Sequence, residues 1–278
     1  MRNSKRSQNI AFFFLFLSTL LIVVPVGLIV VIIIIKGLPA INWQFIFDIP
    51  RQGMRAGGIF PAIIGTVYLV TGAIFFALPI GLLAAIYLSE YARDNFLTRI
   101  IKLAIINLSG VPSVVYGLFG LALFVVFFKF GASILSGSLT LGIMILPIII
   151  TTSREALESV PQSFREVSLS LGASKWQTIR HIVLPNAIPG ILTGTILGLG
   201  RAAGETAPIL FTVAAFYLPR LPKSIFDQAM ALPYHLYVIS TQVPNVDEKI
   251  RYGTAFVLLA LVLFMNLVAI IKIGRAHV

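Results

Sequence analysis

The chain has 278 residues, of which 58% are hydrophobic and 11% charged, a formal net charge of +11 and no cysteine. Its mean hydropathy is +0.98, and so little polar surface could not cover a water-soluble protein, so the chain is predicted to lie in a membrane. The lack of cysteine excludes disulfides and thiolate metal sites, and none of the three histidines lies in a metal-ligand spacing.

Runs of about twenty apolar residues can cross the roughly 30 Å hydrocarbon layer as helices, and the alternation typical of barrel strands is missing. We therefore expect an all-α membrane protein with six transmembrane helices at residues 11–35, 60–89, 100–130, 138–152, 188–216 and 253–271. The first run is too long for a signal peptide and lacks a small-residue cleavage site, so we expect it to be retained.

An even number of helices places both termini on one side of the membrane. The segments on that side carry slightly more Lys and Arg than the others, which favours cytoplasmic termini. The net positive charge is therefore interpreted as membrane orientation and not as nucleic-acid binding. The last six residues, 273–278 (IGRAHV), resemble a translated sequencing adapter, so we expect a non-native tail after a membrane domain of residues 1–272.

No Gly-x-x-x-x-Gly-Lys-Ser/Thr loop occurs in the sequence. We therefore expect no nucleotide, metal or other cofactor in this chain, and any ATP would have to be used by a partner.

The segment between the fourth and fifth expected helices has mixed charge and helical apolar spacing at Val167, Leu171 and Ile179. Gly172 interrupts this spacing and Pro185 ends it, which predicts two short helices joined at the glycine. Taken alone, such a segment is also compatible with a solvated surface loop.

The spacing of this segment matches a known pattern. A Glu-x-x triplet is followed after three residues by a glycine, and after nine more by Ile-x-Leu-Pro, which resembles the EAA loop of ABC importer permeases. The family's Ala-Ala is replaced by Val-Ser. The residues that carry the match are Glu166, Val167, Ser168, Gly172, Ala173, Ile182, Leu184 and Pro185.

The resemblance implies a type I ABC importer permease, in which residues 154–186 form a cytoplasmic coupling loop that sits in a cleft of an ATPase. ATP and Mg²⁺ would then be bound by that partner, and the permease itself would not be an enzyme.

Three further stretches, residues 57–70, 108–124 and 184–212, resemble the PstA branch of phosphate-specific permeases. The string GRAAGETAPI at residues 200–209 is typical of that branch, whereas the sister PstC branch has Thr-Met after the glutamate. The resemblance implies an importer of inorganic phosphate by alternating access, in preference to molybdate or sulfate, located in the cytoplasmic (inner) membrane of a bacterium or archaeon.

The same resemblance implies a set of partners. These are a PstC-like permease in a heterodimer, two PstB-like ATPase subunits, and a PstS-like phosphate-binding protein that docks on the outer loops 37–59 and 218–252, with membrane lipid around the helices.

Arg201 and Glu205 lie four residues apart in the fifth apolar run, in the same helical arc as three glycines. A charge in the membrane costs roughly 2.5–3.5 kcal/mol unless it faces protein or water, so this face is expected to point into the helix bundle. The pair could lock helix packing or serve transport, and the resemblance favours transport.

Within the resemblance, Arg201 would offset the phosphate charge and Glu205 would compete for Arg201 so that the ion is released. Arg154 is a weaker choice because interfacial arginines commonly anchor helices. A polar stripe of Ser109, Ser113 and Tyr116 is compatible both with a lining of the same path and with hydrogen bonding between helices. The expected pathway residues are Arg201, Glu205, Thr206, Arg154, Ser113 and Tyr116.

Two other classes of protein remain open at this point. A secondary transporter or channel would also carry charges within the membrane, but would not need the coupling loop. A purely structural membrane subunit would need neither Arg201 nor Glu205.

Overall fold

The computed structural model of the chain describes residues 2–274, so residues 275–278 of the expected tail lie outside the described residues. Helices dominate this part of the chain, together with a two-stranded hairpin. In chain order the elements are α1 (Arg2–Gly37), η1 (Leu38–Ala40), α2 (Trp43–Phe47), β1 (Pro50–Arg51), η2 (Gln52–Met54), β2 (Ala56–Gly57), α3 (Phe60–Ile86), η3 (Tyr87–Tyr91), α4 (Phe96–Ser109), α5 (Ser113–Gly120), η4 (Leu121–Phe127), α6 (Ile134–Glu158), α7 (Gln162–Ser170), α8 (Lys175–Thr178), η5 (Ile179–Val183), α9 (Leu184–Gly204), α10 (Ala207–Thr212), α11 (Leu232–Thr241) and α12 (Glu248–Gly274).

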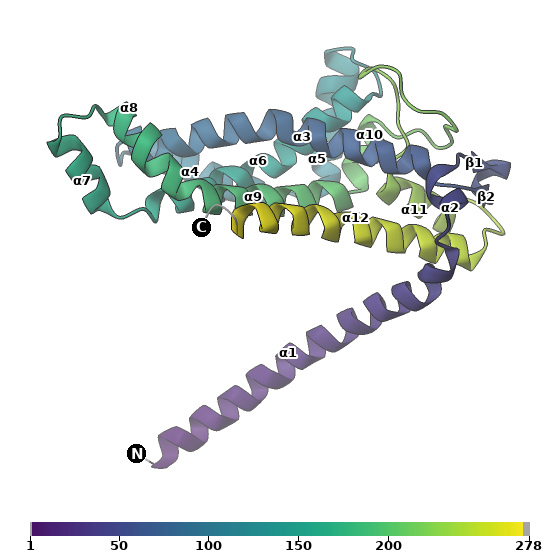
Figure 1. Cartoon of the computed structure of the whole chain (residues 1–278), viewed down its shortest axis with the longest axis horizontal. Helices are drawn as coiled ribbons and strands as arrows, with labels where there is room; N and C mark the ends of the chain where they lie inside the picture. The colour runs from purple at the N-terminus through teal and green to yellow at the C-terminus, as the bar shows by residue number, and fades with distance from the viewer. Residues whose placement is uncertain (1, 275–278) are drawn as a thin grey trace.

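Five stretches of helix are long and apolar enough to cross a membrane, and α4 with α5 forms a sixth, bent pair. The expected all-α membrane architecture is therefore confirmed, with four of the six spans close to their predicted positions. Helices α3, α6, α9 and α12 run side by side, and α7 and α8 project from one end of this bundle (Figure 1). Both described ends of the chain lie toward that same end, as an even number of spans requires.

Helix α1 leaves the bundle at an oblique angle and contacts it mainly at its C-terminal end, beside α12 (Figure 1). The most apolar part of its span, Ala11–Ala40, contains no buried residue. Apolar side chains along most of this helix therefore have no partner in the same chain, so lipid or another subunit must surround them.

The prediction of a continuous helix over residues 100–130 is wrong. Helix α4 ends at Ser109, and the chain bends by 102° before α5 begins. Pro112 causes the break, because it has no N–H to donate and its ring would clash with the carbonyl of Leu108. That carbonyl instead accepts hydrogen bonds from Val111 N (3.1 Å) and from the Tyr116 hydroxyl (2.8 Å).

The prediction of a continuous helix over residues 188–216 is wrong for the same reason. Helix α9 ends at Gly204, Glu205 is extended (φ −78°, ψ 135°), and α10 starts at Ala207. Pro208 would clash with the carbonyl of Gly204 if the helix continued. The first part of the predicted span, residues 188–204, is helical as expected, although the helix begins earlier, at Leu184.

The core of the bundle forms where α6 packs against α3 and α9. A side chain at Gly190 would meet Ala156, and one at Gly194 would collide with Thr152. Small residues therefore let the backbones of α9 and α6 approach closely, as the glycine stripe predicted. The face of α9 with the glycines points into the bundle.

The segment between α6 and α9 has the two predicted short helices. The chain passes between α7 and α8 at Gly172, whose φ of +83° is strained for residues with a side chain. Ser174 begins α8 with a capping box, in which its hydroxyl accepts from Gln177 N and the Gln177 side chain accepts from Ser174 N.

The opposite end of the bundle has the small β-hairpin, in which Pro50 pairs with Gly57 and Arg51 with Ala56. Short helix α11 packs beneath the loop that follows α10, and its first amide, Leu232 N, donates to the Thr66 hydroxyl at 2.8 Å. This hydrogen bond fixes α3 to the outer segment that contains α11.

Candidate functional site

The pair Arg201 and Glu205 lies where α9 breaks. Arg201 Nε is 3.6 Å from Glu205 Oε1, and the two side chains are 29% and 19% exposed. Glu205 reaches Arg201 from an extended residue and not from the next turn of a helix. The arginine lies in the last turn of α9, where its positive charge is favoured by the helix dipole.

The two helix breaks lie close together, because α5 packs against α10. A side chain at Gly117 would meet Phe211, Pro208 and the carbonyl of Ala207. Tyr116, next to Gly117 in the chain, is buried in α5. The structure thus places the helix that carries Tyr116 against α10, which follows the Arg201–Glu205 pair in the chain.

The predicted stripe of Ser109, Ser113 and Tyr116 on one helix face does not exist, because the break at Pro112 separates Ser109 from the others. The Tyr116 hydroxyl donates to a backbone carbonyl of α4, so it holds the break together. Ser113 opens α5 and is half-buried, and Thr206 precedes α10 and is also half-buried.

A groove between α9 and α12 opens beside Arg201. It is lined by Thr193, Ile196, Leu197, Gly200 and Arg201 of α9 and by Val262 and Asn266 of α12. Asn266 Oδ1 is buried and has no hydrogen-bond partner among the described residues. The sequence analysis missed Asn266, although an amide within an otherwise apolar run was a signal that could have pointed to it.

Arg154 is not part of this group. Helix α6 places Ile145 and Ile149 opposite Gly198, whereas Arg154 lies at least one turn further toward the coupling loop. Its Nε is 3.5 Å from Glu158 Oε1 but makes no hydrogen bond. Together with Lys102 of α4 it lines a small separate hollow. The structure therefore separates Arg154 from the other expected pathway residues.

The residues of the coupling-loop pattern lie on the outside of α7 and at the start of α9. Glu166 and Val167 are exposed and Ser168 is half-buried, where its hydroxyl lies 2.9 Å from the Thr178 hydroxyl. Gly172 is exposed between the helices and Ala173 is half-buried. Large apolar side chains are uncovered here, namely Phe164, Val167, Leu169, Leu171 and Trp176.

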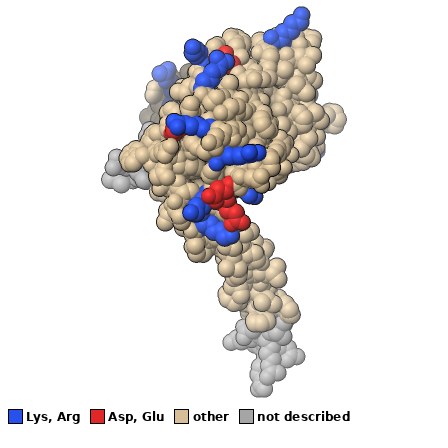
Figure 2. Space-filling model, turned by 90° about the vertical axis from the view of Figure 1, so that its right-hand side faces the viewer, with Lys and Arg blue, Asp and Glu red and all other residues tan. Residues whose placement is uncertain are grey.

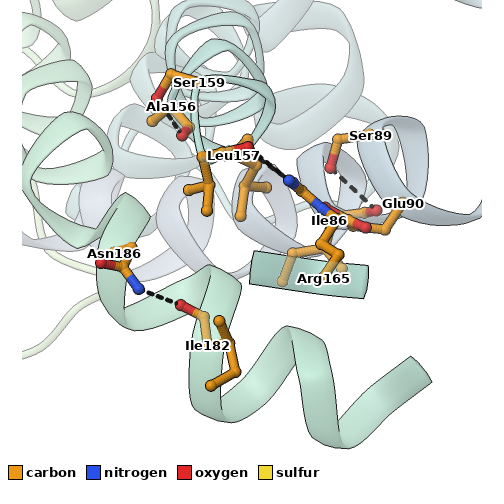
Figure 3. Close-up of polar contacts among 10 residues, drawn as sticks. Ile86, Ser89, Glu90, Ala156, Leu157, Ser159, Arg165, Ile182 and Asn186 are labelled. Atoms are coloured by element: carbon orange, nitrogen blue, oxygen red, sulfur yellow. Dashed lines mark hydrogen bonds and ion pairs between the residues drawn. The ribbon is translucent and has the colours of Figure 1, made fainter. Parts of the chain in front are cut away.

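The end of the pattern forms the entry to α9. Ile182 and Leu184 are half-buried and Pro185 is exposed in the first turn of the helix. Pro185 and Pro189 remove backbone donors here, and the side-chain amide of Asn186 donates to the carbonyl of Ile182 at 2.7 Å (Figure 3).

The end of the molecule opposite the coupling loop carries several basic side chains and fewer acidic ones (Figure 2). The basic residues at this end include Arg51, Arg55, Arg220, Lys223, Lys249 and Arg251. Such a surface attracts anions toward this end of the bundle.

Among residues 2–274, no three His, Cys, Asp or Glu side chains are grouped in a way that could hold a metal ion.

The profile of one protein family, described as binding-protein-dependent transport system inner membrane component, matches residues 77–274. The chain is 36% identical to a probable ABC transporter permease protein, YqgI, of Bacillus subtilis, with 85% of each chain covered. It is 35% identical to the phosphate transport system permease protein PstA of Mycobacterium leprae, with 94% of this chain and 86% of the relative covered. The PstA protein of Xylella fastidiosa is 34% identical over 84% of this chain and 81% of its own length.

Solved structures share the fold at low sequence identity. A chain of the methionine ABC transporter MetNI, in an inward-facing conformation, superposes with a TM-score of 0.63 at 16% identity, over 77% of this chain and 94% of that chain. A chain of a bacterial ABC transporter that imports alginate superposes with a TM-score of 0.57 at 14% identity, over 81% and 80% of the two chains. The arrangement of helices is therefore that of a type I ABC importer permease.

Proposed function

The chain belongs to the family of binding-protein-dependent transport system inner membrane components, and from that premise we propose that it is the PstA-type permease subunit that carries inorganic phosphate through the membrane. PstA-named relatives at 32–35% identity over most of the chain support this substrate. The observation that carries the proposal is the Arg201–Glu205 pair at a break in a membrane helix.

The helix break gives Arg201 a function that a continuous helix would not provide. Because α9 ends at Gly204, the backbone groups around the break are not all used within a helix, and Gly204 borders open space. Guanidinium matches phosphate geometry and stays protonated. Arg201 therefore offsets the charge of a passing phosphate, while Glu205 reclaims the guanidinium and prevents the anion from being trapped.

Thr206 and Ser113 complete this pathway with hydroxyl groups from both broken spans, and Tyr116 fixes α5 to α4 beside them. Arg154 acts further along, near the coupling loop, where it receives the anion on its way out. Its partly buried guanidinium and its weak pairing with Glu158 support that role.

The chain needs partners for this work. The apolar side chains left uncovered on α7 and α8 fit a groove of an ATPase, and two such PstB-like subunits bind ATP and Mg²⁺. The unburied span of α1 fits the membrane face of a PstC-like permease. The basic end opposite the coupling loop receives a PstS-like phosphate-binding protein.

In this arrangement the coupling loop and both termini are cytoplasmic, and the permease performs no covalent chemistry. ATP binding draws the ATPases together, moves the coupling loops and opens the pathway outward, and hydrolysis returns it inward.

Phosphate uptake by proteoliposomes that contain all four components tests the proposal. We expect uptake that depends on ATP and is not displaced by excess sulfate or molybdate, with arsenate as the competitor of closest geometry. Uptake in the absence of the ATPase, or transport of another oxyanion in preference to phosphate, would contradict it.

A further inference from the structure

The end of α3 nearest the coupling loop holds α7 through one buried ion pair. Arg165 of α7 donates from Nη2 (2.8 Å) and Nε (3.2 Å) to a single carboxylate oxygen of Glu90. Glu90 lies in η3, a π-helical turn that ends the span of α3. The two side chains are 13% and 8% exposed, whereas every other salt bridge between described residues has a side chain at least 29% exposed.

The same guanidinium also caps α6. Arg165 donates from Nη1 to the carbonyl of Val160 (2.6 Å) and from Nη2 to that of Leu157 (2.8 Å) (Figure 3). Leu157 lies in the last turn of α6 and Val160 lies two residues beyond its end, where the helix dipole favours a positive charge. One side chain of the coupling helix α7 therefore binds the ends of two membrane helices.

A second contact joins the same turn of α3 to the other half of the coupling loop. Lys175, the first residue of α8, places its ammonium 4.9 Å from the centre of the Tyr91 ring. The hydroxyls of Ser168 and Thr178 connect α7 to α8. Glu90 and Tyr91 thus hold both short helices of the loop.

The chain connectivity alone would pass a movement of this loop to α6 and α9, which precede and follow it. Helix α3 is not adjacent to the loop in sequence, and at its far end the Thr66 hydroxyl accepts from Leu232 N of the outer loop. A movement delivered to α3 would therefore reach the outer end of the bundle.

We propose that the Glu90–Arg165 pair is a positioning pair that transmits the movement of the coupling loop to α3. The inference rests on the proposed function, because it presumes that an ATPase moves α7. Without the pair, ATP hydrolysis continues on assembled complexes but α3 no longer follows each stroke, so fewer anions are imported per ATP.

The test compares the number of ATP molecules hydrolysed per phosphate imported in proteoliposomes of the complete importer. Glu90→Ala is expected to raise this ratio by about fivefold or more. Asp94→Ala is the matched control, because Asp94 is an exposed carboxylate four residues along the chain, and it should leave the ratio unchanged. The subunit composition of each complex is checked by size-exclusion chromatography.

The lack of cysteine in this chain allows a rescue that a merely structural role would not show. Glu90→Cys combined with Arg165→Cys should have a raised ratio. Joining the two thiols with a short reducible cross-linker should restore the ratio to near the unaltered value, and reduction should raise it again. If the Glu90→Ala complex does not assemble, the ratio measured with and without the cross-link tests the role of the pair instead.

An assembled Glu90→Ala complex with an unaltered ratio, or a cross-link without effect on the ratio, would overturn the inference. If the unaltered importer carries no phosphate, the proposed substrate is wrong instead, and the same ratios are then measured with the oxyanion that it does carry.

Discussion

Arg201 Nε lies 3.6 Å from Glu205 Oε1 although helix α9 ends at Gly204, between the two residues. An i, i+4 pair within a continuous helix has its spacing fixed by the helical repeat, whereas Glu205 lies beyond the end of α9 in extended backbone. The break, and not the helical repeat, therefore sets the geometry of this pair.

Replacing Arg201 tests its role in transport. Arg201→Ala is expected to reduce uptake to about 1% or less, since no other cation at the break offsets the anion. Arg201→Lys should retain about one-tenth of uptake, because lysine keeps the charge but loses the bidentate geometry. Uptake of radioactive phosphate by proteoliposomes measures both variants.

Assembly and ATP binding should be unchanged in both variants. The control is Arg99→Ala, an exposed arginine of α4. Normal uptake by Arg201→Ala would remove Arg201 from the pathway and leave the pair as a packing feature.

Close packing of α9 on α6 predicts the effect of a larger residue at Gly194. Gly194→Val would drive a side chain into Thr152 and should destabilise the bundle by about 1–3 kcal/mol. Thermal unfolding in detergent measures the change. Gly27→Val is the control, because a side chain at Gly27 of α1 meets nothing within 4 Å. A Gly194→Ala variant should recover stability when combined with Thr152→Ala, and a lack of recovery would contradict the assigned contact.

His235 predicts a loss of stability in acid. It lies in α11, outside the spanning helices, and burial lowers its pKa from 6.5 to about 4. The unfolded chain therefore binds a proton between about pH 6.5 and 4 that the folded chain does not, so this contribution is full above pH 6.5 and falls as the pH decreases. The loss by pH 4 is about 3 kcal/mol.

The midpoint of thermal unfolding, followed from pH 7 to pH 4.5, measures this effect. His235→Leu cannot be protonated and should flatten the pH dependence, even if its stability at pH 7 differs. Identical pH profiles for the variant and the unaltered chain would exclude His235 as the cause.

Leu171 tests the coupling surface. It is 83% exposed at the end of α7, so Leu171→Asp should leave the stability of the isolated subunit unchanged. It should weaken assembly with the ATPase by about tenfold or more, because a charge would enter an apolar contact. Titration of the ATPase onto the permease pair in detergent measures the affinity. Ser170→Asp, at an exposed neighbouring residue, is the control. Equal losses of ATPase affinity in the two variants would show that the added charge, and not the loss of an apolar contact at Leu171, weakens assembly.

Much of the architecture could be predicted because apolar length and small-residue spacing are local properties. The spans that became α1, α3, α6 and α12 and the two helices joined at Gly172 all follow from such patterns. The spans that became broken were mispredicted because hydropathy ignores the hydrogen bond that a proline removes. Pro112 and Pro208 were visible in the sequence, and both errors came from giving the apolar run more weight than the proline.

The sequence by itself determined the membrane class and the positions of the long apolar spans, because a bilayer imposes length and polarity on each segment separately. The tertiary structure alone decided which polar groups meet. It packed α5 against α10 beside two helix breaks, placed Arg154 apart from the Arg201–Glu205 pair, and buried Glu90 against Arg165, 75 residues away in the chain. Such contacts depend on how helices pack and where their axes break, and no local periodicity encodes either.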